Sequence, residues 1–167
     1  MRYIDKLPDP KGEAAVLGTF VHEILEHLLT LQPDHRSIDA AKKIARELWD
    51  QVLEDEDFQA LAFSDDDAKE FRWKAWRLIE KYFAIEDPTR VDVLRAEQEL
   101  AVEIAGVPFF GIVDLTEQIS DGIRVVDYKT GKAPSSRFVE DKLSQVWLYA
   151  AALAEQKVDR KSTRLNS

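Results

Sequence analysis

Residues 111–132 read GIVDLTEQISDGIRVVDYKTGK, and this stretch decides the fold of the chain. Two runs of apolar, mostly β-branched residues flank Ser120-Asp121-Gly122, whose glycine tolerates the positive φ that a tight turn needs. The pattern therefore predicts a β-hairpin. It carries Asp114 on its first strand and Asp127 and Lys129 on its second.

The polar residues of this hairpin admit two interpretations. Side chains alternate along a strand, so Asp127 and Lys129 are expected on one face and Tyr128 on the other. Two acids and a lysine among apolar neighbours are costly to bury unless something pairs with the charges. A divalent metal ion with a reacting phosphate would do so, and an ordinary surface hairpin with its polar face in water explains the same residues.

The composition places the chain among soluble globular proteins. With 167 residues, of which 45% are hydrophobic and 33% charged, it is long enough for one domain with a real core and short for two. No apolar run approaches the roughly 20 residues that span a membrane, and no secretory signal opens the chain. We therefore expect a cytoplasmic protein with no membrane partner.

Two further counts exclude classes of site and partner. The chain has no cysteine, so disulfides, cysteine-type zinc sites and an iron–sulfur cluster are impossible within this segment. The formal net charge of −9 argues against a generic nucleic-acid binder, whose surface would usually be basic. It leaves room for an enzyme whose bound metals cancel acidic charge locally.

The first half of the chain is predicted to be helical. Apolar residues recur at helical spacing over three stretches, 14–31, 38–54 and 64–85. Ser37 is placed to cap the second helix, and Ser64 with Asp67 forms a capping-box-like start for the third. The charged run at 54–57 is expected to be a solvated helix end or a loop.

A histidine and a basic stripe distinguish these helices. His22 lies beside the apolar face of the first helix, one turn after Gly18; taken alone, such a histidine is more often a packed or surface residue than a ligand. The third helix carries four cations that fit a solvated surface or a track for a nucleic-acid backbone: Arg72, Lys74, Arg77 and Lys81.

Strands and one more helix are predicted after the helical half. Strands at 91–104 and 107–117 precede the last strand of the hairpin, and a helix is expected at 138–157. On that helix Gln145 and Tyr149 are four residues apart and share a face.

The last nine residues, 159–167 (DRKSTRLNS), do not continue the apolar periodicity of the predicted helices and strands. They resemble the in-frame translation of a common sequencing adapter. We therefore expect the natural sequence of this chain to stop near Val158 and the chain to be a truncated fragment. Residues 1–158 would form one domain, with a helical part at about 14–87 and a sheet and catalytic core at about 91–157. Residues 159–167 would be a non-native tail.

Four motifs follow one another in this chain: GTFVHE on a helix, GIVD and DYKTGK on strands, and QVWLY on a helix. This combination resembles the RecB-type nucleases of the PD-(D/E)XK superfamily, including RecB-family exonucleases. The resemblance implies an α/β (mixed α+β) fold with a restriction-endonuclease-like core, a central mixed sheet of three or more strands flanked by helices, and a helical N-terminal half. The matching residues are Gly18, His22, Gly111, Asp114, Asp127, Lys129, Gly131, Gln145 and Tyr149.

The resemblance also implies a metal site. Its ligands would be His22, Asp114, Asp127 and the main-chain carbonyl of Tyr128, with Mg²⁺ or Mn²⁺ as the cofactor, because these hard cations favour oxygen ligands and tolerate one imidazole. Lys129, which completes the motif with the second aspartate, would orient the attacking water or stabilise charge on the phosphate.

Further site residues follow from the same resemblance. Gln145 and Tyr149 match an element that helps hold the substrate and the site, and Glu97 matches an additional acidic position on the preceding strand. Arg72, on the third helix, is a candidate DNA contact. Arg77 and Lys132 are two more.

The implied function is a metal-dependent DNA nuclease, exonuclease-like, that hydrolyses phosphodiester bonds of single strands or duplex ends in DNA repair or recombination. A helicase subunit or domain would be its partner. The alternative is a catalytically silent nuclease-fold module that binds DNA or docks in a helicase–nuclease complex. A structural Ca²⁺-binding protein also fits the acidity, but gives no reason for Lys129 beside the acids.

Overall fold

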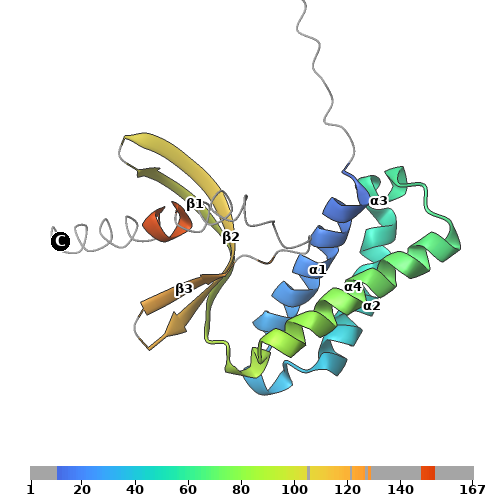
Figure 1. The fold of residues 1–167 in the computed structure, drawn as a ribbon, viewed down its shortest axis with the longest axis horizontal. Helices are drawn as coiled ribbons and strands as arrows, with labels where there is room; N and C mark the ends of the chain where they lie inside the picture. Colours follow the sequence, from blue (N-terminus) through green and yellow to red (C-terminus); the bar gives the residue numbers. More distant parts are fainter. Residues whose placement is uncertain (1–10, 105, 121, 127, 129–147, 153–167) are drawn as a thin grey trace, which may run out of the picture. The chain divides into compact units, whose positions relative to one another are not determined.

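The computed structural model describes residues 11–104, 106–120, 122–126, 128 and 148–152. The chain divides into two compact units, a helical unit up to Thr89 and a sheet unit from Arg90 onward (Figure 1). The extent of a single domain stays a prediction.

Four α-helices form the helical unit within the described residues: α1 Glu13–Thr30, α2 Ile38–Glu54, α3 Glu56–Ala60 and α4 Asp65–Ile85. Short 3₁₀ turns occupy Pro33–His35 and Pro88–Arg90. The three predicted helices are confirmed to within one residue. The charged run at 54–57 is the junction of α2 with a short helix that the sequence pattern did not predict, α3, whose N-cap Asp55 accepts a 2.9 Å hydrogen bond from the Phe58 N–H.

Side-chain caps start α2 and α4 where the sequence predicts them. The Ser37 hydroxyl accepts a hydrogen bond from the Ala40 N–H at 3.1 Å. Ser64 and Asp67 form a reciprocal capping box, in which each side chain accepts from the other residue's N–H. The Ser64 hydroxyl also donates to the Asp67 carboxylate at 2.6 Å, and this hydrogen bond, together with the one from the Ser64 N–H, lowers the pKa of the exposed Asp67 carboxyl.

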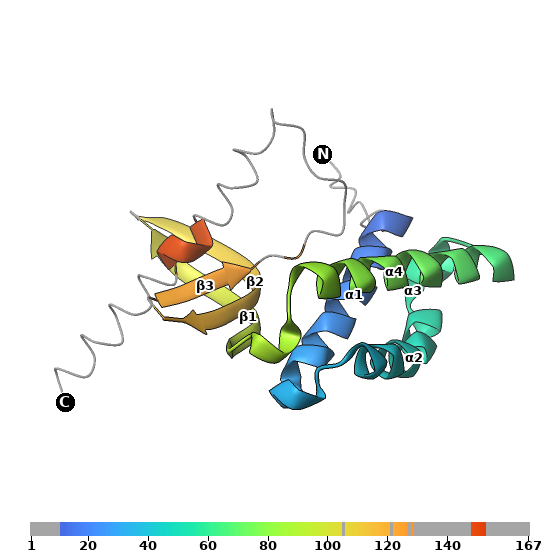
Figure 2. The same cartoon turned by 60° about the horizontal axis from the view of Figure 1, so that its bottom comes forward.

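The core of the helical unit gathers around α1, which contacts each of the other three helices (Figure 2). Its apolar face buries Ile24, Leu28 and Leu29 almost completely. Phe71 of α4 is fully buried, and four aromatic rings lie with their centroids 5.3–6.2 Å from its own: Phe20, Trp49, Phe58 and Phe63. Among the described residues, no helix is both long enough and apolar enough to cross a membrane.

The sheet unit contains three described strands in the order β1-β2-β3: β1 Val93–Ile104, β2 Val107–Ile119 and β3 Gly122–Val126. All pair antiparallel. The predicted hairpin is confirmed, since β2 and β3 pair from Leu115↔Val126 to Ile119↔Gly122. Gly106, with φ +80°, lies in the turn between β1 and β2. The expected mixed α/β class, with a helical N-terminal half, is likewise confirmed.

A small core lies on one face of this sheet. Leu100 of β1 and Val113 of β2 are buried with Tyr149 and Ala152, and Phe109 packs against them. Residues 148–152 are helical, as predicted for the final helix; the remainder of that predicted helix lies outside the described residues.

Candidate metal and nuclease site

Asp114 is half-buried on β2 and reaches the main chain of the neighbouring strand segment. Its Oδ2 accepts a 2.6 Å hydrogen bond from the Tyr128 N–H. The bond lies just beyond the last ladder pair, Leu115↔Val126, and so continues the attachment of the two strands of the hairpin. Two of the predicted ligand positions, Asp114 and Tyr128, are thereby brought together.

Glu97 lies on β1, the strand that pairs with the strand of Asp114. Ala96 pairs with Leu115 and Gln98 with Val113, so Glu97 and Asp114 fall between the same two pairs of the β1–β2 ladder. Glu97 has a φ of +42°, in the left-handed region that residues other than glycine rarely adopt. Within the described residues, Ala62 is the only other non-glycine with a positive φ, and it lies between helices rather than in a strand.

The backbone of Glu97 is unfavourable for a regular strand, because a left-handed non-glycine residue adds about 1 kcal/mol or more of strain. Strain of this kind persists mainly at sites where the surrounding structure imposes it for function. Carboxylates are suitable donors for a hard divalent cation such as Mg²⁺ or Mn²⁺, and binding of such an ion by Glu97 and Asp114 stays a prediction.

Gly111 and Tyr149 form the packing contact behind this site. A Cβ added to Gly111 would lie 2.6 Å from Cε1 of Tyr149 and 3.3 Å from Cζ of Phe109. The Tyr149 ring is buried and meets the Phe109 ring edge-on at a centroid distance of 5.9 Å. The glycine of the GIVD motif therefore lets the final helix pack its tyrosine directly on the strand that carries Asp114.

The remaining predicted ligands are not assembled by the described residues. His22 is half-buried on α1, in the helical unit, whereas Asp114 belongs to the sheet unit, so their meeting stays a prediction. No cluster of three or more candidate ligands occurs within the residues the structure describes. Four predicted site residues lie outside them: Asp127, Lys129, Lys132 and Gln145.

The cations predicted along α4 have different surroundings. Lys74 is engaged by two carboxylates, with Nζ 2.8 Å from Glu13 and 3.1 Å from Glu70, and these hydrogen bonds raise its pKa. Arg77 is exposed. The Arg72 guanidinium lies 5.0 Å from the centroid of the Trp49 ring. Contacts with other described residues thus explain how the side chains of Arg72 and Lys74 are held.

Sequence reasoning missed a second charged pair in the sheet. Glu117 is buried, and its carboxylate accepts two hydrogen bonds of 2.8 Å from Arg124, the facing residue on β3. In the sequence, the only indication of this pair was that an acid and a base lie equally far from the predicted turn. That spacing becomes informative once the register of β2 and β3 is known. This bidentate pair holds the hairpin together in the middle of the β2–β3 ladder.

Comparison with known proteins bears on the family of the chain. The family model of the PD-(D/E)XK nuclease superfamily matches residues 1–166. No curated protein and no solved structure gives a match. Members of the superfamily are generally nucleases, which implies DNA as the substrate. With nearly all of its length matched, the chain belongs to the PD-(D/E)XK nuclease superfamily.

Proposed function

We propose that the chain is a Mg²⁺- or Mn²⁺-dependent deoxyribonuclease that degrades single strands or duplex ends during DNA repair or recombination. The observation that carries the proposal is the strained backbone of Glu97, which falls between the same two ladder pairs as Asp114. Family membership supports nuclease chemistry in general, and these two acids supply a reason for a divalent cation at this position.

Asp114 and Glu97 are the proposed metal ligands among the described residues. The Tyr128 N–H fixes the orientation of the Asp114 carboxylate, which has about four lone-pair positions and so keeps capacity for a cation. By resemblance, His22 and Asp127 join them, together with the Tyr128 carbonyl. A bound ion would supply Lewis acidity toward the phosphate and a more acidic water.

The other proposed residues act on the substrate. Lys129 orients the attacking water or stabilises the negative charge that develops on the phosphate. Gln145 helps hold the DNA. Tyr149, packed on Gly111, positions the helix that carries both residues of this motif.

Hydrolysis of labelled DNA tests the proposal. We expect the purified protein to shorten single-stranded oligonucleotides with Mn²⁺ or Mg²⁺ and to stop when EDTA is added. Asp114→Asn should lower the rate about 100-fold or more, because it removes the ligand charge. Glu99→Gln is the matched control: Glu99 is exposed on β1, two residues from Glu97, and should tolerate the change.

One outcome would replace this proposal. A protein that binds DNA but cleaves none with either metal would instead be the catalytically silent binding or docking module. Cleavage that Asp114→Asn leaves unchanged would separate nuclease activity from the proposed site.

A further inference from the structure

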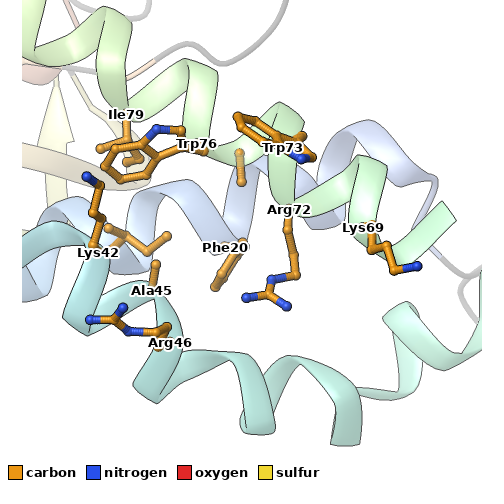
Figure 3. A pocket seen from close by; sticks show the side chains of 11 residues that line it. Phe20, Lys42, Ala45, Arg46, Lys69, Arg72, Trp73, Trp76 and Ile79 are labelled. Atoms are coloured by element: carbon orange, nitrogen blue, oxygen red, sulfur yellow. The ribbon is translucent and has the colours of Figure 1, made fainter. Parts of the chain in front are cut away.

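A cavity of about 390 Å³ opens in the helical unit between α1, α2 and α4 (Figure 3). Phe20 and Ile24 of α1 contribute apolar surface to its lining. The chemistry-bearing residues come from the other two helices: Lys42, Arg46, Lys69, Arg72, Trp73 and Trp76. We call this the basic groove. It does not include any of the proposed metal ligands.

The groove is positively charged although the chain carries a net charge of −9. Four of its lining residues are cationic and none is acidic. In the described part of the chain, no carboxylate lies within 4.0 Å of Arg46 or Arg72. Two lysines do have acidic neighbours on their own helices, Asp39 at 3.8 Å from Lys42 and Asp66 at 2.9 Å from Lys69, but such exposed pairs are weak.

Helical spacing brings these cations to one place. Lys42 and Arg46 are four apart on α2, and Lys69, Arg72 and Trp73 lie within about one turn of each other on α4. Figure 3 shows the two guanidinium groups beside the hollow and both tryptophan rings along its α4 side.

The tryptophans supply flat apolar surface at the edge of the groove. Trp73 is 64% exposed, which is unusual for the largest apolar side chain. Trp76 is held in place, because its Nε1–H donates to Glu80 at 2.8 Å and the Lys42 ammonium lies 5.2 Å from its ring centroid. Arg72 is likewise stacked on Trp49, which orients the guanidinium while its N–H edges keep their donors.

We infer that the basic groove binds a segment of single-stranded DNA, with bases stacked on Trp73 and phosphates held by Arg46 and Arg72. Single-stranded nucleic acid presents a π-face and a negative charge at every nucleotide, which is the combination this groove complements. Paired bases within a duplex do not expose that face for stacking. The inference deepens the proposed function and rests on it for the identity of the substrate.

Binding can be measured without cleavage. Fluorescence anisotropy of the full chain with a labelled thymidine oligonucleotide of about 12 nucleotides, in EDTA, reports affinity alone. We expect Trp73→Ala to weaken binding by roughly tenfold and Trp73→Phe to retain most of it, because a phenyl ring still stacks. Replacing Arg46 and Arg72 together by alanine should weaken binding and lower the salt slope by about 1.4, the value for two phosphate contacts on a single strand.

A neighbouring residue provides the matched control. Lys43 is exposed on α2 beside Lys42, does not line the groove, and pairs with Glu47 at 3.6 Å. Lys43→Ala makes the same type of charge change and should leave the affinity within about twofold of the wild type. Far-UV circular dichroism on each variant verifies that the helices remain folded.

The outcomes separate this inference from the nuclease proposal. Groove variants that bind like the wild type, an equal loss in Lys43→Ala, or equal affinity for a duplex of the same length would overturn the groove inference alone. A wild-type protein that binds through the groove but cleaves no DNA with either metal would overturn the nuclease proposal alone.

Discussion

The carboxylate of Asp114 accepts a 2.6 Å hydrogen bond from the main-chain N–H of Tyr128, so one side chain serves both as a proposed metal ligand and as an attachment within the hairpin. These two roles respond differently to substitution. Asparagine keeps an acceptor oxygen and loses the charge, whereas alanine loses both.

Asp114→Asn is therefore expected to abolish hydrolysis while leaving stability nearly unchanged. Asp114→Ala should abolish hydrolysis and also lower the free energy of unfolding by about 1–2 kcal/mol, because the Tyr128 N–H loses its acceptor. Urea unfolding and a cleavage assay on both variants check this. Equal destabilisation by the two substitutions would mean that the charge, rather than the hydrogen bond, supports the hairpin.

Substitution of Glu97 tests whether the strain in its backbone serves the proposed function. With φ at +42°, Glu97→Gly should raise the free energy of unfolding by about 1 kcal/mol, since glycine adopts this conformation without strain. The same variant should lose most hydrolysis.

Glu99→Gly is its control. Glu99 pairs regularly with Ile112, and glycine at an ordinary strand position lowers stability by roughly 0.5–1 kcal/mol. If both glycine variants destabilise alike, Glu97 is not strained in solution.

The helices illustrate what the sequence predicts well. Their apolar periodicity and the caps at Ser37 and Ser64 involve residues within one or two turns, so α1, α2 and α4 begin and end within one residue of the predicted positions. The hairpin was equally local, because two residues separate the paired Ile119 and Gly122. The expected positive φ at Gly122 was wrong, since this glycine begins β3 as an ordinary strand residue.

Features that depend on distant register could not be predicted. The alternating sequence around Glu97 indicates a regular strand, yet the β1–β2 ladder shifts register between Val93 and Arg95, and Glu97 has a left-handed backbone. Resemblance named Glu97 and Asp114, but only the pairing of β1 with β2 shows that both fall between the same two ladder pairs.

The basic groove also could not be predicted, because it depends on contacts between residues that are distant in the sequence. Arg72 and Arg77 were grouped as DNA contacts because they lie on one helix. The structure instead places Arg72 in a cavity with Arg46 of α2, while the intervening Lys74 pairs with Glu13 and Glu70. Spacing along one helix does not reveal which neighbouring helix contributes the partner residues.

Gly111 should tolerate no side chain. Gly111→Ala places a Cβ 2.6 Å from the buried Tyr149 ring and is expected to lower the free energy of unfolding by about 1–3 kcal/mol. In a Tyr149→Leu background the added cost should largely disappear, which a double-mutant cycle measures.

Gly122→Ala is the reference for this cycle, because a Cβ there meets no atom within 4 Å. A cost of Gly111→Ala that persists without the tyrosine ring would assign the glycine to backbone conformation instead of this packing contact.

The capping box predicts a pH dependence for α4. Ser64 lowers the pKa of Asp67 below its ordinary value of 3.8, so the stabilisation is present above that value and is lost as the pH falls through the lower pKa of the folded state. Thermal unfolding between about pH 2 and pH 7 should show the wild type more stable than Asp67→Ala near neutrality and the two converging in acid. Asp66→Ala, which removes an exposed carboxylate outside the box, should not reproduce this convergence.

The last prediction concerns the contribution of the Glu117–Arg124 pair to stability. The Glu117 side chain is only 7% exposed, so Arg124→Ala leaves a carboxylate desolvated with its facing guanidinium removed and should lower the free energy of unfolding by about 3 kcal/mol. Combining it with Glu117→Gln should restore part of that loss, because the buried charge is removed together with its partner. Urea unfolding of the single and double variants measures the coupling. If the double variant is less stable than Arg124→Ala, the carboxylate is stabilised by groups other than Arg124, and the hairpin does not depend on this pair.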